Sequence, residues 1–111
     1  MSESEKRDAS LPLLTALQAA VAASKTDRQR ATTLHERALF LSTEVGEALK
    51  EVLVLCGVYG KDAIESGRAH LATELCDVIW NACDLATLAG IDLGESMQAL
   101  LEKNSKRTWA K

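Results

Sequence analysis

The chain contains few of the residues that sheets and disulfide scaffolds require. Its 111 residues include a single proline, Pro12, and only 4% aromatic residues, while alanine and leucine are abundant. Alanine and leucine favour helices, whereas aromatic and β-branched residues favour strands, so the composition predicts an all-α fold. The three cysteines (Cys56, Cys76 and Cys83) lack Cys-x-x-Cys spacing. Neither a disulfide framework nor a zinc knuckle is therefore indicated, and we expect Cys76 and Cys83, seven positions apart on one helical face, to be reduced thiols that pack as small side chains.

Long apolar runs and a basic surface are also missing. No stretch approaches the roughly 18 apolar residues of a membrane helix, and the first residues are charged and polar. A formal net charge of −3 provides no uniform basic footprint for nucleic acid. We therefore expect a cytoplasmic protein that has neither a membrane nor a nucleic acid as partner. The length predicts a single domain over residues 11–111, preceded by a flexible N-terminus over residues 1–10.

The charges that are present are unevenly distributed. Residues 44–102 contain eleven acidic and three basic residues. Residues 103–111 contain no acidic residue and four basic ones, namely Lys103, Lys106, Arg107 and Lys111. An acidic centre beside a basic tail is the combination that a site for a metal ion and phosphate needs.

Two pairs of acidic residues dominate the acidic centre. Glu44 and Glu47 are separated by three positions, and so are Glu74 and Asp77, with 26 residues between the pairs. Three positions place two side chains on one face of a helix, within one turn of each other. Two antiparallel helices could bring all four carboxylates together, where they would repel one another unless a cation lay among them. Oxygen ligands suit hard ions, so the pattern favours Mg²⁺, with Mn²⁺ as a possible substitute.

We expect three or four helices arranged as an antiparallel bundle, with no sheet. Ser10 can cap the first helix, which would have Pro12 in its first turn and end near Ser24. Residues 25–33 read as a basic connection. Its bases are either solvated or contact phosphate at the mouth of the site, and they are Lys25, Arg28 and Arg30.

The second and third helices carry the acidic pairs. We expect the second over residues 33–56, ended by Gly57, and the third from residues 62–67 to residue 89, ended by Gly90. Gly46 lies inside the second helix, where glycine needs a packing or close-approach reason. Asp92 can cap a fourth helix, with Glu95 completing a capping box.

Both acidic helices show the same pattern, an apolar seam with carboxylates along one border. Glu51 continues that border on the second helix, and His70, Asn81 and Asp84 continue it on the third. Such a small chain with apolar seams on two long helices would complete its core by pairing with a second copy.

The ordered motifs resemble the MazG-like all-α nucleoside triphosphate pyrophosphohydrolases. These motifs are Glu44-Val-Gly-Glu47, Glu74-Leu-Cys-Asp77 and Lys103-Asn104-x-x-Arg107, and the resemblance covers about residues 34–109. It implies hydrolysis of a nucleoside triphosphate, often a deoxynucleotide, to the monophosphate and pyrophosphate. It also implies a role in cleaning the nucleotide pool and a homodimer or homotetramer, in which the tail of one subunit could serve the site of the next.

The resemblance also implies roles for individual residues. The Mg²⁺ ligands would be Glu44, Glu47, Glu74 and Asp77. The substrate would be held by Asn81, Lys103, Asn104 and Arg107. Members of the family often have a further glutamate at the position of Thr43, which this chain lacks. A carboxylate not fully used in ligation could act as the general base, and Glu47 and Glu51 are the candidates.

Three alternatives remain open at this point. A phosphoribosyl-ATP-type pyrophosphohydrolase shares the helical scaffold, although the Lys103-Asn104-x-x-Arg107 tail argues against it. A non-catalytic helical module that binds nucleotide or protein is favoured by Thr43 and opposed by the four retained acids. A di-iron bundle would need Glu-x-x-His pairs, which the sequence lacks. Trp80 and Trp109 are expected in the core or an interface, with stacking on a nucleobase as the alternative.

Overall fold

The structure, a computed structural model, describes the backbone of residues 3–107 and the side chains of residues 13–107. This part of the chain contains only α-helices, which confirms the predicted fold class. The helices are α1 (Glu3–Ser24), α2 (Asp27–Arg30), α3 (Leu34–Leu55), α4 (Lys61–Leu88) and α5 (Leu93–Ser105).

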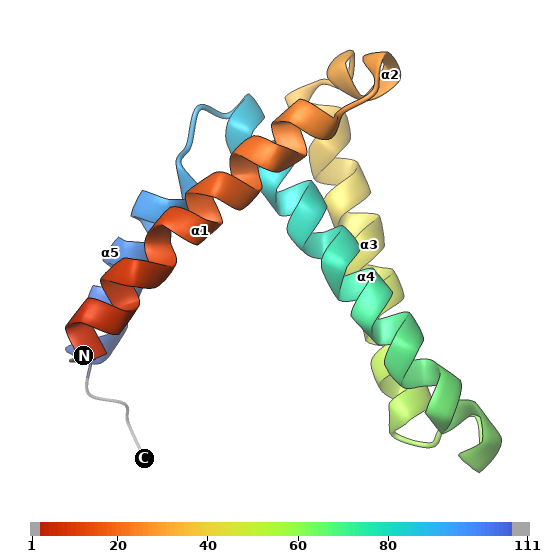
Figure 1. Cartoon of the computed structure of the whole chain (residues 1–111). Helices are drawn as coiled ribbons and strands as arrows, with labels where there is room; N and C mark the ends of the chain where they lie inside the picture. Colours follow the sequence, from red (N-terminus) through yellow and green to blue (C-terminus); the bar gives the residue numbers. More distant parts are fainter. Residues whose placement is uncertain (1–2, 108–111) are drawn as a thin grey trace.

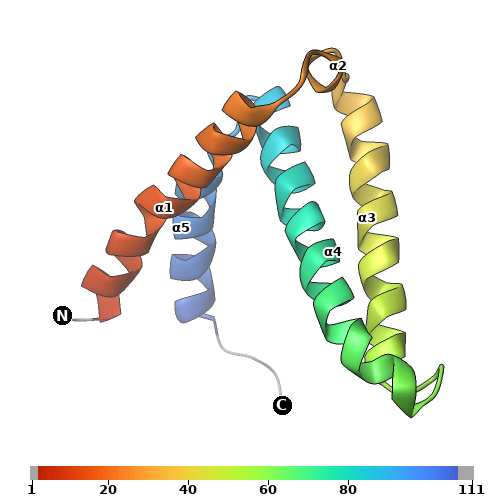
Figure 2. The same cartoon turned by 45° about the vertical axis from the view of Figure 1, so that its right-hand side comes forward.

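The helices form two arms that meet at an apex (Figures 1 and 2). One arm is the antiparallel hairpin of α3 and α4, which has the most extensive helix–helix contact of the molecule. The other arm pairs α1 with α5, and α1 also contacts α4 near the apex. The acidic pairs lie midway along the first arm, because α3 and α4 carry them near their centres.

The boundaries of the two long helices follow from their end residues, as predicted. The Thr33 side chain accepts the N–H of Glu36 at 3.1 Å and so caps α3. Gly57 and Gly90 have φ of 83° and 73°, in the left-handed region that glycine tolerates. Asp92 caps α5 by accepting the N–H of Gly94 at 2.8 Å.

Two expectations about the helices were wrong. Helix α1 begins at Glu3 instead of after Ser10, so Pro12 lies inside the helix and not in its first turn. Residues 3–9 are rich in glutamate, lysine, arginine and alanine, which favour helix. The connection after α1 also contains a single helical turn, α2, so the described residues form five helices. Thr26 and Gln29 start that turn with a reciprocal capping box.

The apex is held by polar contacts of Gln18. Its Nε2 donates to the carbonyl of Ile91 at 2.7 Å, and its Oε1 accepts the N–H of Leu93 at 2.9 Å. Because these partners lie between α4 and α5, one side chain of α1 fixes the turn that joins the two arms.

The single chain encloses very little apolar core. Among the described side chains, the buried apolar ones are Val21, Ala48, Cys83 and Ala86. Cys76, expected to pack, is exposed, and all three cysteines are free thiols. The radius of gyration is 17.0 Å, whereas a compact domain of this length has about 13 Å. The chain is therefore an open shape whose apolar surfaces are only partly covered. No described helix has the length and apolar character needed to cross a membrane.

Candidate active site

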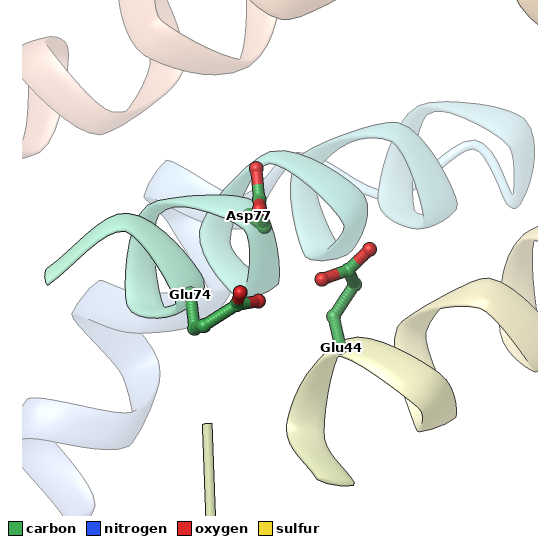
Figure 3. Close-up of side chains that lie close together, drawn as sticks. All are labelled: Glu44, Glu74 and Asp77. Carbon is green, nitrogen blue, oxygen red and sulfur yellow. The ribbon is translucent and has the colours of Figure 1, made fainter. Parts of the chain in front are cut away.

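Three of the four predicted metal ligands come together in the α3–α4 arm. Glu44 projects from α3, and Glu74 and Asp77 project from α4, with one carboxylate oxygen of each within 4.8 Å of the others (Figure 3). We call these three residues the acidic cluster. They converge because the antiparallel hairpin places the middle of each helix at the same level.

Glu47 borders the acidic cluster without belonging to it. It is exposed and lies one turn after Glu44, and its carboxyl interacts with Glu74. Burial raises the pKa of Glu74 to about 7, with added contributions from the hydrogen bond and charge of Glu47 and then from Glu44. Burial, followed by the charges of Glu47 and Asp77, also raises the pKa of Glu44. Burial and the neighbouring carboxylates thus oppose the ionisation of Glu44 and Glu74.

The acidic cluster fits a divalent cation. Oε2 of Glu44 and Oε2 of Glu74 are buried and have no hydrogen-bond partner among the described residues. Buried acceptors without a donor are costly, and a cation would satisfy both at once. An all-oxygen carboxylate set is the kind that Mg²⁺ and Mn²⁺ prefer.

Two neighbouring positions have local partners. Glu51, two turns along α3 from Glu44, has Oε2 at 3.8 Å from Nδ1 of His70. Thr43 donates its hydroxyl to the carbonyl of Leu39 at 3.2 Å, within its own helix. Glu51 therefore lies near His70, one turn beyond Glu47, whereas Thr43 does not replace the missing glutamate.

A cavity of about 470 Å³ opens beside the acidic cluster. Its walls come from α2 and the residues that follow it, from α3 and from α4. The lining residues are Arg28, Gln29, Thr32, Arg37, Phe40, Glu44, Asp77, Trp80 and Asn81. The cavity is thus lined by two carboxylates of the acidic cluster, by two aromatic rings and by the two basic residues Arg28 and Arg37.

A buried ion triad made of Lys25, Arg37 and Asp84 supports the cavity. Asp84 is fully buried, with Oδ1 at 2.7 Å from Nζ of Lys25 and Oδ2 at 2.7 Å from Nε of Arg37. Nη1 of Arg37 donates to Oδ1 of Asn81 at 2.8 Å, and Nδ2 of Asn81 donates to the carbonyl of Asp77 at 2.8 Å. A chain of contacts thus connects the triad to the backbone of the acidic cluster.

Arg37 also contacts two aromatic rings. Its guanidinium carbon lies 5.0 Å from the ring centre of Trp80 and 5.4 Å from that of Phe40. These are cation–π distances. Trp80 therefore lines the cavity next to a cation instead of filling an apolar core. Trp109 lies outside the described residues.

Sequence reasoning overlooked Arg37 and Phe40 and did not assign a role to Asp84. A usable signal was the helical spacing. Arg37, Glu44 and Glu51 follow one another at seven-residue intervals on α3, which puts all three on one face. On α4, Asp84 follows Asp77 by the same interval.

The predicted tail residues lie elsewhere. Lys103 and Asn104 belong to the last turns of α5 and Arg107 follows it, at the end of the α1–α5 arm that is remote from the apex (Figure 2). None of them lines the cavity of the same chain. Asn81, in contrast, lies in the cavity wall, although its amide is partly engaged by Arg37 and Asp77.

Comparisons with known proteins agree with the geometry. The family model of the MazG nucleotide pyrophosphohydrolase domain matches residues 32–109, which contain α3, α4 and α5. A dATP/dGTP diphosphohydrolase of Cyanophage S-2L is 46% identical over 50 residues, which are 45% of this chain and 48% of that relative. The chain thus spans about half the length of this curated relative. No solved structure matches the chain. The family match confirms the resemblance found in the sequence motifs.

Proposed function

Because the chain belongs to the MazG nucleotide pyrophosphohydrolase family, we propose that it hydrolyses nucleoside triphosphates to monophosphate and pyrophosphate with Mg²⁺. The observation that carries this proposal is the acidic cluster with two unpartnered buried oxygens at the end of a 470 Å³ cavity. Cavities of about 300–1,000 Å³ accommodate small-molecule ligands, a range that includes nucleotides.

Glu44, Glu74 and Asp77 would hold the metal ion, with Glu47 within reach as a fourth ligand or as a base. Bound Mg²⁺ would supply positive charge to the phosphate oxygens as the pyrophosphate leaves. Mn²⁺ has the same ligand preference and would substitute.

We assign Glu47 as the general base that takes the proton from the attacking water. It is exposed to solvent, and its carboxyl lies beside Glu74 without belonging to the acidic cluster. Glu51 is the second candidate, because it lies one turn beyond Glu47, with its carboxyl near His70. A base must lie within hydrogen-bond reach of the proton it removes, and Glu47 is the nearer of the two to the cluster along α3.

The nucleoside would lie against the two aromatic rings of the cavity. Phe40 and Trp80 provide ring faces on which a base can stack, and Arg28, Gln29 and Thr32 provide donors on the opposite wall. The relative from Cyanophage S-2L is named for dATP and dGTP. We therefore propose purine deoxynucleoside triphosphates as substrates and removal of unwanted nucleotides from the cytoplasmic pool as the role.

We propose that a second copy of the chain completes the enzyme. Leu39, Leu49 and Leu53 are 59%, 61% and 47% exposed, and together with Gly46 they form one stripe along α3. A partner helix can approach closely at Gly46, since no described atom lies within 4 Å of the position of a Cβ there. This stripe would join two subunits in a homodimer or homotetramer. Lys103, Asn104 and Arg107 of one subunit would then bind the triphosphate held by the other.

The experiment is pyrophosphate release from a panel of common ribo- and deoxynucleoside triphosphates, with and without Mg²⁺. Wild-type protein is expected to cleave deoxypurine substrates only with the metal. Glu44→Gln should lose at least about 100-fold in rate, because it removes a ligand, and even the outer partners of a metal site are worth 10–100-fold. Glu65→Gln, at an exposed acid of α4 outside the cluster, is the matched control and should keep full activity.

A second readout separates binding from catalysis. Mg²⁺ should raise the unfolding temperature of wild-type protein and of Glu65→Gln, but not that of Glu44→Gln. Folded protein that binds Mg²⁺ and releases no pyrophosphate from any nucleotide of the panel would refute the proposed activity and favour a binding module.

A further inference from the structure

Lys25 is a buried cation in a segment that is otherwise exposed. It lies between the end of α1 and the start of α2, and its side chain is only 7% accessible. Its Nζ is 2.7 Å from Oδ1 of Asp84, which is fully buried on α4. Taking an ammonium group out of water is unfavourable, so a buried lysine requires a partner and a structural reason.

Charge balance alone does not supply that reason. Asp84 is already paired with Arg37, whose Nε lies 2.7 Å from Oδ2. The buried ion triad therefore contains two cations and one carboxylate. Since Arg37 by itself neutralises Asp84, the second cation is surplus to the pair that joins α3 to α4.

Helix α2 depends on a tether, because it has little other attachment. None of its residues is buried. The hydrogen bonds found for residues 26–33 are local. They run from the capping box of Thr26 and Gln29 to the first turn of α3, and among the described residues none reaches beyond Arg37, whose N–H donates to the carbonyl of Thr33. On its N-terminal side, the contact that links this segment to the rest of the fold is the pair of Lys25 and Asp84.

The position of α2 matters because it forms one wall of the cavity. Arg28, Gln29 and Thr32 line this wall, opposite residues of α3 and α4. The acidic cluster, in contrast, belongs entirely to α3 and α4. A shift of α2 would alter the width of the cavity while leaving the cluster in place.

We infer that Lys25 is a positioning residue, whose buried ion pair with Asp84 fixes α2 as the wall of the nucleotide cavity. Lys25 sets how tightly the nucleoside is held and does not touch the reacting phosphate. The effect on nucleotide affinity rests on the proposed function, whereas the effect on α2 does not. Loss of Lys25 weakens substrate binding and leaves the chemical step intact, which appears as a raised KM with unchanged kcat.

The test compares Lys25→Met with wild type, and Lys61→Met serves as the control at an exposed lysine of α4. Lys25→Met leaves Asp84 and Arg37 as a neutral pair, so the fold is retained. Amide hydrogen exchange reports on α2 directly. The N–H groups of Arg30, Ala31 and Thr32, which bond within the turn, should exchange about tenfold faster in Lys25→Met, while those of residues 83–88 in α4 stay protected. Lys61→Met should match wild type at both places.

Kinetics supply the second readout. In Lys25→Met, KM for the deoxynucleotide should rise about tenfold and kcat should stay within about twofold of wild type. Lys25→Arg keeps the charge and should bring KM back to within about threefold of wild type. If Lys25→Met fails to fold, Lys25→Ala, which also leaves Asp84 paired with Arg37 and cannot donate to it, replaces it in both measurements.

The outcomes are separable. Unchanged exchange at Arg30, Ala31 and Thr32 in the uncharged variant overturns the inference, and so does a fall in kcat with an unaltered KM. If wild-type protein cleaves no nucleotide, the proposed function fails. The exchange experiment then still decides whether Lys25 positions α2.

Discussion

Helix α4 contributes to two clusters of charge, one of which contains only carboxylates while the other pairs its carboxylate with two cations. Two turns apart, Asp77 belongs to three converging carboxylates that have no cation among the described residues, and Asp84 is enclosed by two cations. The first group contains buried carboxylate oxygens that have neither a hydrogen bond nor a cation beside them among the described residues, and the pKa values of Glu44 and Glu74 are raised. In the second, both oxygens of the carboxylate are paired.

The contrast distinguishes a charge that serves the fold from charges that serve a ligand. The buried ion triad links the segment between α1 and α2 to α3 and α4, and it does so whether or not a ligand is bound. Replacing such buried ion pairs with apolar residues is nevertheless often neutral for stability. The acidic cluster opposes folding until a cation arrives. Removing a carboxylate should therefore have opposite effects in the two places.

The largest effect is expected for Asp84→Asn. It leaves Lys25 and Arg37 buried without an anion, and breaking a buried pair in this way costs about 3–5 kcal/mol in the free energy of unfolding. Lys25→Met, which leaves a neutral pair, should cost clearly less. Glu44→Gln should leave the metal-free protein unchanged or more stable. Urea unfolding in EDTA measures all three, and equal losses in Asp84→Asn and Glu44→Gln would show that the two clusters do not differ.

The acidic cluster should also give the metal-free protein a distinctive pH dependence. Glu74 has its pKa raised from 4.5 to about 7, so between these values the folded protein binds more protons than the unfolded chain. Stability attributable to Glu74 therefore falls as the pH rises from about 4.5 to 7, the reverse of an acid in a salt bridge. The measurement is the unfolding temperature in EDTA against pH, for wild type and Glu74→Gln.

The difference in unfolding temperature between wild type and Glu74→Gln isolates the contribution of Glu74 from that of other titrating groups. Wild type should become progressively less stable than Glu74→Gln as the pH rises through this window. Adding Mg²⁺ at pH 8 should restore wild type and not the variant, since a metal ion favours the ionised carboxylate. A wild-type advantage that grows with pH in EDTA would contradict the expectation.

Local sequence signals predicted much of this molecule. The cap at Asp92 and the left-handed glycines at 57 and 90 set helix ends as predicted, since each acts on the backbone next to it, whereas the cap at Thr33 was not predicted. The i, i+3 spacing brought Glu74 and Asp77 to one face. What local spacing does not determine is how far the facing helix is rotated, and this rotation places Glu44 in the cluster and leaves Glu47 beside it.

The less predictable features depend on distant partners. The triad joins residues 25, 37 and 84, and a lysine in a polar connection gives no sign that it will be buried. The open angle between the arms depends on Gln18 and the turn after α4, which also removes Lys103 and Asn104 from the cavity of their own chain. The predicted start of α1 at Ser10 is wrong because the helix-favouring composition of residues 3–9 extends the helix back to Glu3.

The smallest effect expected concerns the hairpin that carries both charge clusters. A Cβ on Gly67 would lie 2.8 Å from Cγ1 of Val54, closer than two carbon atoms can approach. Val54 is β-branched and adapts poorly, so Gly67→Ala should cost about 1–3 kcal/mol despite the better helix propensity of alanine. The midpoint of urea unfolding measures this loss of stability. Nucleotide turnover by the Gly67→Ala variant reports on whether the acidic cluster is disturbed.

A second substitution, Val54→Ala, tests whether the close contact with Val54 is the cause of the instability of Gly67→Ala. Val54→Ala removes Cγ1, the atom that would lie closest to a Cβ at position 67, so the double variant should be more stable than the sum of the single effects predicts. The single Val54→Ala variant provides the remaining corner of the cycle. Simple additivity would mean that α3 and α4 do not approach each other closely at Gly67.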